Sequence, residues 1–202
     1  KEGHELRKFD YIVSNPPFKL DFSEYHSDLK ADHYRGRFFA GIPNIQQRQE
    51  GDGNIPLLFQ SFAISLKDTG KGAIVVPTGF ITAKSGIAFK IRKHLVDNKI
   101  LKGVVSMPSN VFANTGTNAG GFIDKNKTEK PVFIDASKLG ETIKIGKNQK
   151  TNLRSDEIAQ IVDISETEGV EQFSVTPSYE EVAEKGYSFL PDSISTLRLN
   201  ML

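Results

Sequence analysis

The sequence contains no cysteine, no excess of either charge and no long apolar run. Without cysteine the chain forms neither disulfides nor thiolate metal sites, which fits the reducing cytoplasm. The 26 Lys and Arg residues balance 25 Asp and Glu residues, so net charge does not indicate a nucleic-acid partner, and only local clusters bear on that question. No apolar run approaches the roughly 18 residues of a membrane span, and the first residues lack the pattern of a signal peptide.

The histidines are scattered, and none lies at a metal-ligand spacing from another histidine or from a carboxylate, so we predict no metal site. The chain has 202 residues, of which 38% are hydrophobic and 25% charged. This composition indicates a globular protein with one substantial domain, or one domain with an appendage. The start at Lys1, shortly before a strand-like run, resembles that of a piece of a longer protein.

The first half of the chain alternates between short apolar runs and helical patterns, which predicts an α/β fold built from βαβ units. Apolar runs predict strands at Phe9–Ser14, 72–77 and 101–107. Apolar spacings of three and four residues predict one helix from Ile55 that ends at Gly70. They predict a second helix through Ile87, Ile91 and Leu95, with a basic outer face formed by Lys90, Arg92 and Lys93.

Residues 121–124 and 132–136 flank a polar turn, so we expect an antiparallel hairpin that closes the edge of the sheet. From residue 137 the chain is polar and has no apolar periodicity. We therefore divide it into a catalytic portion, residues 1–136, and a basic linker with a small helical extension, residues 137–202. In the extension, Ser155 is a predicted N-cap, and Ser178 with Glu181 predicts a capping box.

The sharpest feature is the corner Asn15-Pro16-Pro17-Phe18 at the end of the first predicted strand. In open α/β sheets, ligands bind at the carboxyl ends of the strands. The two prolines fix φ and remove backbone donors, and Pro16 biases Asn15 towards extended geometry. The corner therefore offers a side-chain amide, carbonyl acceptors and an aromatic ring on a stiff backbone.

These groups suit methylation of the exocyclic amino group of adenine, whose lone pair is conjugated with the ring and weakly nucleophilic. The Asn15 side-chain oxygen and the Pro16 carbonyl would accept its two N–H groups and favour a pyramidal nitrogen. Phe18 would stack on a base that has left the duplex. The alternative is that the prolines form only a rigid turn and Phe18 is a core residue. A match to these four residues alone favours the rigid turn. The preceding strand, the following loop and the order of the downstream elements favour the catalytic interpretation instead.

The chain resembles the modification subunit of type I restriction-modification systems over about nine tenths of its length. The matching stretches are FDYIVSNPPF, IPLLFQSFAISLK, GAIVVPTGFIT, SGIAFKIRKHLVDNKILKGVVSMPSNVFANTGTN, and FIDASKLG with GKNQ. The resemblance implies an adenine-N6 DNA methyltransferase that uses S-adenosyl-L-methionine. It also implies a partial Rossmann-like methyltransferase sheet, mixed in direction, with the hairpin at its edge. The implied partners are DNA, a specificity subunit, a second modification subunit and a restriction subunit.

By this resemblance residues 15–18 are the catalytic motif, and Asn15 also contacts the cofactor. Phe112 resembles a second aromatic wall of the base pocket, with a loop anchor as the alternative, and Pro77 would line the same cleft. The glycine-rich cofactor loop of the family lies upstream of the motif and is absent here, so we expect the chain alone to be inactive. Ala119-Gly120-Gly121 replaces a β-branched strand, which predicts an altered edge.

Two groups of basic residues are candidates for DNA contacts. Arg35 and Arg37 lie among aromatic residues in the polar segment 19–54, which either grips unstacked DNA or docks on the domain. Lys144, Lys147 and Lys150 repeat in a polar stretch that could meet phosphate. We also expect one unpaired edge on the strand Phe9–Ser14, which would associate with another molecule or be covered by segment 19–54.

Two other functions remain open from the sequence. The same motif serves amino-methyltransferases that act on RNA or on a glutamine amide, although the downstream stretches favour DNA. A non-catalytic DNA-binding or assembly module is the alternative from another class, because the cofactor loop is missing. Titration with S-adenosylmethionine separates the two classes, since an assembly module gives no saturable heat.

Overall fold

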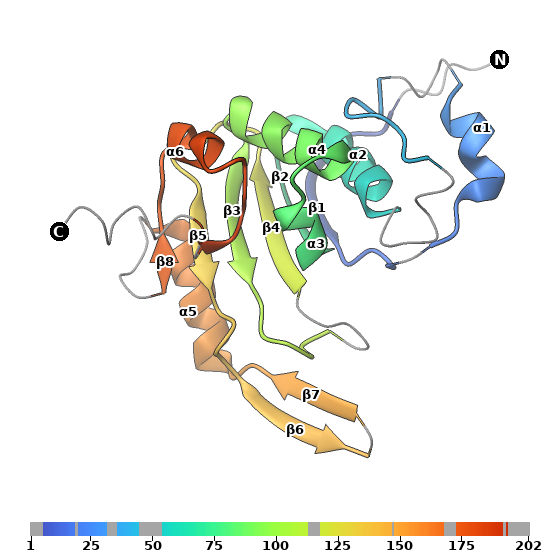
Figure 1. Ribbon diagram of the computed structural model, residues 1–202. Helices are drawn as coiled ribbons and strands as arrows, with labels where there is room; N and C mark the ends of the chain where they lie inside the picture. The colour runs from blue at the N-terminus through green and yellow to red at the C-terminus, as the bar shows by residue number, and fades with distance from the viewer. Residues whose placement is uncertain are drawn as a thin grey trace.

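The computed structural model describes residues 6–18, 20–31, 36–44, 54–112, 118–146, 148–167, 173–191 and 193. Strands and helices alternate up to residue 106, and strands then follow one another as far as residue 152 (Figure 1). The elements are β1 (Phe9–Ser14), η1 (Ser23–Tyr25), α1 (His26–Leu29), α2 (Ile55–Ser65), β2 (Leu66–Pro77), α3 (Thr78–Thr82), α4 (Gly86–Asp97), β3 (Leu101–Ser106), β4 (Asn118–Asp124), β5 (Val132–Asp135), β6 (Glu141–Ile145), β7 (Asn148–Asn152), α5 (Ser155–Glu166), β8 (Ser174–Val175) and α6 (Tyr179–Glu184).

A mixed, six-stranded sheet in the order β1-β2-β4-β3-β5-β8 forms the centre of the molecule. β1 is parallel to β2, and β3 is parallel to β5, whereas β4 and β8 run antiparallel to their neighbours. The α/β fold class and the three strands predicted from apolar runs are confirmed. These runs are rich in β-branched and aromatic residues, which favour strands.

The expected hairpin between residues 121–124 and 132–136 is wrong. β4 lies in the middle of the sheet, paired with both β2 and β3, and β5 lies on the far side of β3. β4 and β5 follow each other in the sequence but do not pair. Between β2 and β3, the backbone N–H and C=O groups of β4 find hydrogen-bond partners on both sides. Gly120 and Gly121 thus belong to a central strand and not to an altered edge. A Cβ at either glycine would meet only ordinary van der Waals contacts, at 3.9 and 3.8 Å, and nothing in the structure explains these glycines.

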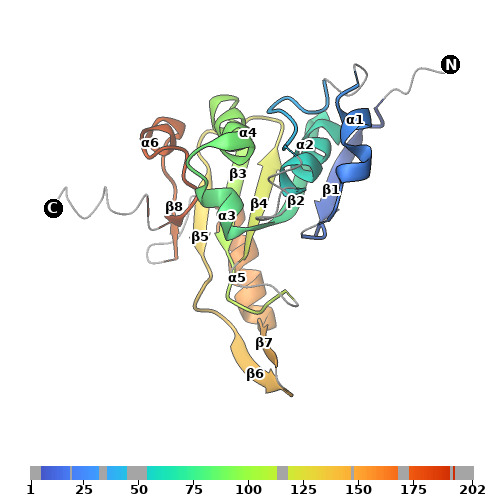
Figure 2. The ribbon, with the colours of Figure 1, turned by 45° about the vertical axis from the view of Figure 1, so that its right-hand side comes forward.

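The two faces of the sheet are covered unequally. One face carries the main core, where Ile74, Val104 and Phe133 pack with residues of α2, α3, α4 and α6. On the other face α5 covers only the β3 and β5 side, through Ile161 and Ile164. Figure 2 shows α2, α3 and α4 on one side of the sheet and α5 on the other. The second face of β1, β2 and β4 is therefore partly open.

Both predicted helices are present, but the end of the first and the exposed face of the second differ from the prediction. α2 ends at Ser65, before the predicted Gly70, because the chain becomes extended at Leu66, which pairs with Phe9. α4 matches its predicted period, but Arg92 is 0% exposed and does not belong to the basic outer face. Its guanidinium donates to the backbone carbonyls of Tyr187, Phe80 and Ala83, so backbone acceptors in the interior stabilise it there.

Residues 137–202 contain more regular structure than a linker. β6 and β7 form a two-stranded ribbon that projects from the main sheet (Figures 1 and 2). β8 extends the main sheet beside β5, and α6 contributes Tyr179 and Val182 to the main core. The Ser178–Glu181 capping box is confirmed, whereas α5 has Arg154 as its N-cap, one residue before the predicted Ser155. The division after residue 136 stays a prediction about domain organisation.

Candidate functional site

The corner predicted to carry the chemistry lies directly after β1. The Asn15 side chain is exposed, Pro16 is buried, and Pro17 is exposed. Phe18 is half-buried and packs against the main core. The corner is thus anchored at Pro16 and Phe18, while Asn15 is free to meet a ligand at the carboxyl end of the strand.

Asn54 is a residue of this site that the sequence reasoning missed. It precedes α2, is 2% exposed, and donates a hydrogen bond from its side-chain nitrogen to the Pro17 carbonyl at 2.7 Å. An asparagine just before Ile55-Pro56 is a helix-start signal, which would have drawn attention to Asn54 as a cap. It would not have indicated the contact with Pro17, because the two residues are 37 positions apart.

The segment after the corner packs on α2. Gln60 accepts from the Ala40 N–H at 2.7 Å and donates to the Gly41 carbonyl at 3.0 Å. Phe22 and Phe38 form a small cluster with Leu57. These polar and apolar contacts hold the described parts of segment 19–54 to α2, and the expectation that this segment covers the edge of the first strand stays a prediction. Arg37 is half-buried in this segment, and Arg35 lies outside the described residues.

Pro77 ends β2 and is the N-cap of the short helix α3. Ser14 is in register with Ile74, so the corner and Pro77 both follow the carboxyl ends of neighbouring parallel strands. Pro77 is half-buried and opposite Asn118 in the register with β4. Its predicted place in the cleft is compatible with this position and stays a prediction.

Phe112 lines an apolar cavity of about 380 Å³ on the partly open face. Val13 and Ser14, which directly precede Asn15, line the same cavity, as do Val75 and Gly120. The cavity therefore joins the strand that leads to Asn15 with the loop that carries Phe112. The assignment of Phe112 to a base pocket remains a prediction, with a half-buried ring as its structural basis.

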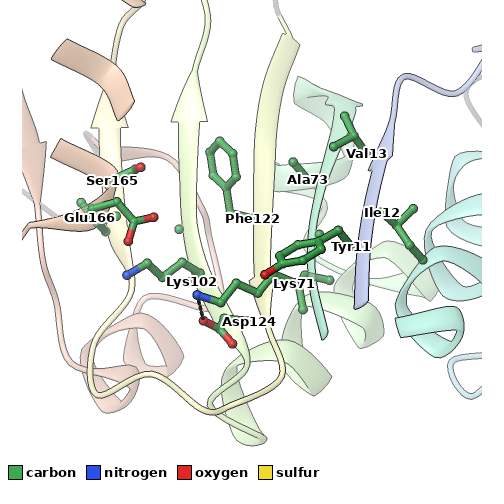
Figure 3. A pocket seen from close by; sticks show the side chains of 14 residues that line it. Tyr11, Ile12, Val13, Lys71, Ala73, Lys102, Phe122, Asp124, Ser165 and Glu166 are labelled. Atoms are coloured by element: carbon green, nitrogen blue, oxygen red, sulfur yellow. Dashed lines mark ion pairs between the residues drawn. The ribbon is translucent and has the colours of Figure 1, made fainter. Parts of the chain in front are cut away.

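A second hollow lies on the same face, towards the start of β1 (Figure 3). Tyr11 and Val13 project from β1 and are 76% and 86% exposed. Lys71 and Asp124 form an ion pair there at 3.3 Å, and the hydrogen bond to Asp124 raises the pKa of Lys71. Burial alone would raise the pKa of Asp124, but its hydrogen bonds with Asn126 and Lys71 lower that pKa below its ordinary value.

β1 is an edge strand that pairs with β2 and with no other strand in the described part of the chain. Its outer backbone edge adjoins the exposed side chains of Tyr11 and Val13. The expectation of an unpaired edge at this strand is thus met among the described residues. An open edge next to exposed apolar side chains favours association with another strand.

The basic residues predicted to meet DNA are only partly described. Lys144 lies on β6 and Lys150 on β7, and both side chains are exposed; Lys147 lies outside the described residues. The ribbon is tied to the loop that leads to Phe112, because the buried Thr151 donates its hydroxyl to the Ser109 carbonyl at 2.6 Å. These lysines are therefore carried on the same side of the molecule as the candidate base pocket.

Two searches concern other classes of site. The described side chains contain no group of three or more His, Asp or Glu residues that could hold a metal ion. Within the described ranges no helix is both long and apolar enough to cross a membrane.

Comparison with known proteins identifies the family of this chain. The model of a family described as N-6 DNA Methylase matches residues 1–196. The chain belongs to this family. It is 27% identical over 199 residues to the Type I restriction enzyme MjaIX methylase subunit of Methanocaldococcus jannaschii, covering 91% of this chain and 34% of that protein. It is 28% identical over 163 residues to the HindI methylase subunit of Haemophilus influenzae, covering 79% of this chain and 34% of that protein.

Solved structures of similar proteins show the same fold. The type I restriction-modification system methyltransferase subunit from Streptococcus thermophilus superposes with a TM-score of 0.76 at 24% identity, covering 96% of this chain and 39% of that one. The EcoKI M protein superposes with a TM-score of 0.63 at 16% identity. The chain spans about one third of the length of the curated relatives.

Proposed function

We propose that this methylase-family chain carries the base-binding corner of an adenine-N6 DNA methyltransferase that works in a type I restriction-modification system. The observation that carries the proposal is the corner of Asn15, Pro16, Pro17 and Phe18, which displays the Asn15 amide at the carboxyl end of β1. The relatives named above are methylase subunits of type I restriction enzymes. Their names support both the reaction and the system.

The corner would act by orienting the amino nitrogen of the base. The Asn15 side-chain oxygen and the Pro16 carbonyl accept its two N–H groups, so that the nitrogen becomes pyramidal and its lone pair is directed away from the ring. No strong base is needed beforehand, because the nitrogen becomes acidic only as the new N–C bond forms. Positioning and electrostatic preorganisation therefore provide most of the rate.

S-adenosyl-L-methionine supplies an electrophilic methyl group when bound. Among the residues assigned to the site, Asn15 fits a contact with it, because its exposed side chain follows a strand whose outer edge is open. Phe18 and Phe112 would hold the extrahelical base on their rings. Pro77 would shape the same cleft from the end of β2.

DNA and the other subunits would be the partners of the full-length protein. The exposed Lys144 and Lys150 on the ribbon would contact phosphates beside the base pocket, and Lys147, Arg35 and Arg37 belong to the same proposal. A specificity subunit, a second modification subunit and a restriction subunit complete the assembly. This chain would work in the cytoplasm, where the DNA is.

Replacing Asn15 with alanine in the full-length protein, assembled with its partner subunits, tests the proposal. Asn15→Ala should lower kcat for methylation by roughly a hundredfold or more, because one preorganised contact to the reacting group is lost. The affinity for S-adenosylmethionine should change little, because in the family the glycine-rich loop upstream of the corner makes most of the cofactor contacts. Asn98→Ala, an exposed asparagine at the C-cap of α4, is the matched control and should retain normal activity. If Asn15→Ala keeps more than about a tenth of the wild-type kcat, the assignment is wrong.

The same preparation separates an enzyme from an assembly module. Calorimetric titration with S-adenosylmethionine should give saturable heat for the full-length wild type. Absence of binding, together with absence of methyl transfer to DNA, would support the alternative of a non-catalytic DNA-binding or assembly module.

A further inference from the structure

The Asn54 side chain does not cap α2, although Asn54 occupies the N-cap position of this helix. An N-cap asparagine ordinarily accepts from the N–H of the second or third helical residue. Here the second helical residue is Pro56, which has no N–H. The N–H of the third, Leu57, donates to the Asn54 backbone carbonyl at 3.1 Å.

The Asn54 amide is instead directed at the catalytic corner. Its nitrogen donates to the Pro17 carbonyl at 2.7 Å, while its oxygen is buried and has no hydrogen-bond partner among the described residues. A buried acceptor without a partner destabilises the folded state, and native structures rarely keep one without a reason. The hydrogen bond that the Asn54 side chain makes among the described residues is the one to Pro17, and it ties the corner to the start of α2.

The contact fixes the peptide between Pro17 and Phe18. A peptide group is planar and rigid, so holding the Pro17 carbonyl also sets the direction of the Phe18 N–H and the position of the Phe18 backbone. Pro16 is buried on the other side of Pro17, and Phe18 packs against the main core. Pro17 itself is exposed, and among the described residues the Asn54 amide is the protein donor that holds its carbonyl.

We propose that Asn54 is a positioning residue for methyl transfer, which holds the Pro17 carbonyl so that the Asn15–Pro16 acceptors and the Phe18 ring keep their relative geometry. The inference rests on the proposed function of the corner. α2 thereby couples two parts of the site, because Asn54 holds the corner and Gln60, on the same helix, holds Ala40 and Gly41 of the segment that follows it.

The test is Asn54→Leu in the full-length protein, with Asn98→Leu as the control at an exposed asparagine far from the corner in sequence. Leucine has the same number and branching of side-chain heavy atoms, removes the unpartnered oxygen and cannot donate to Pro17. We expect an unchanged or raised unfolding midpoint, unchanged KM for S-adenosylmethionine and a kcat about ten- to a hundredfold lower, because small displacements of reacting groups have effects of this size. Asn98→Leu should leave KM and kcat unchanged and lower the unfolding midpoint only slightly, through the lost hydrogen bond to the His94 carbonyl.

A spectroscopic measurement reports the corner directly. DNA with 2-aminopurine at the target position brightens when the base leaves the stack, and Asn54→Leu should reduce this signal at saturating protein. If Asn54→Leu fails to fold, Asn54→Ala is measured in the same assays and normalised to the folded fraction.

Three results would overturn the inference: kcat within about twofold of wild type, a fall in kcat accounted for by lost folded protein, or an unaltered 2-aminopurine signal with normal turnover. These results differ from failure of the proposed function, in which wild type itself transfers no methyl group or Asn15→Ala remains active.

Discussion

Removal of the Arg92 side chain is expected to destabilise the fold. Arg92 is 0% exposed, and three backbone carbonyls accept its N–H groups, with Nε to Tyr187 at 2.7 Å. Its guanidinium also lies over the rings of Phe89 and Phe189, at 6.0 and 5.6 Å. Burial lowers the pKa of Arg92 to about 10, so it remains a cation at neutral pH.

The magnitude follows from the groups that lose their donors. Arg92→Met keeps an apolar stem but leaves three carbonyls without their donors, each at a cost of about 1–3 kcal/mol when it stays buried. Two of the three bonds are only partly buried, so water compensates some of the loss, and relief of the buried charge offsets a further part. We expect a loss of about 3 kcal/mol in the free energy of unfolding.

Chemical denaturation of Arg92→Met and wild type measures this loss. Lys93→Met is the matched control, because Lys93 is the next residue along α4 but is exposed, with an ion pair to Asp97 at 2.8 Å. It should lower stability far less, since exposed ion pairs contribute little. A loss below about 1 kcal/mol for Arg92→Met, or equal losses for the two variants, would refute the role given to the buried guanidinium.

Three further predictions concern the corner, the open edge and the acid side of the stability curve. Phe18→Ala should weaken binding of DNA with a mismatched target by about 1–3 kcal/mol and binding of ordinary duplex by less; equal losses would make Phe18 a core residue only. The 202-residue chain by itself should self-associate through β1 and bind S-adenosylmethionine negligibly, and Val13→Lys should lower its mass in light scattering; an unchanged mass would place the contact elsewhere. The pKa of Asp124 is lowered in the folded state, so the ionised carboxylate stabilises the fold above its unfolded pKa of about 4, and this stabilisation is lost as pH falls through the folded pKa. Asp124→Asn should therefore reduce the fall in the free energy of unfolding at acid pH. Parallel curves of this free energy against pH for the variant and wild type would contradict the reasoning.

Short-range interactions account for what the sequence alone determined. The apolar runs of β1, β2 and β3 and the Ser178–Glu181 capping box depend on residues within one element. The stiff corner at residues 15–18 is equally local, because two prolines restrict their own φ and their neighbour's conformation. The α/β class follows from the alternation of such elements, and the motif within it indicated the family.

Tertiary contacts decided the rest. β4 could not be placed from its sequence, since pairing between β2 and β3 depends on partners on both sides. Arg92 reads as part of a basic helical face, and its burial is favourable because the fold brings the carbonyls of Phe80, Ala83 and Tyr187 to its guanidinium. Asn54 reads as a helix cap, and only the folded chain brings it to Pro17. A buried polar side chain needs a partner, and when that partner is distant in sequence only the three-dimensional structure reveals it.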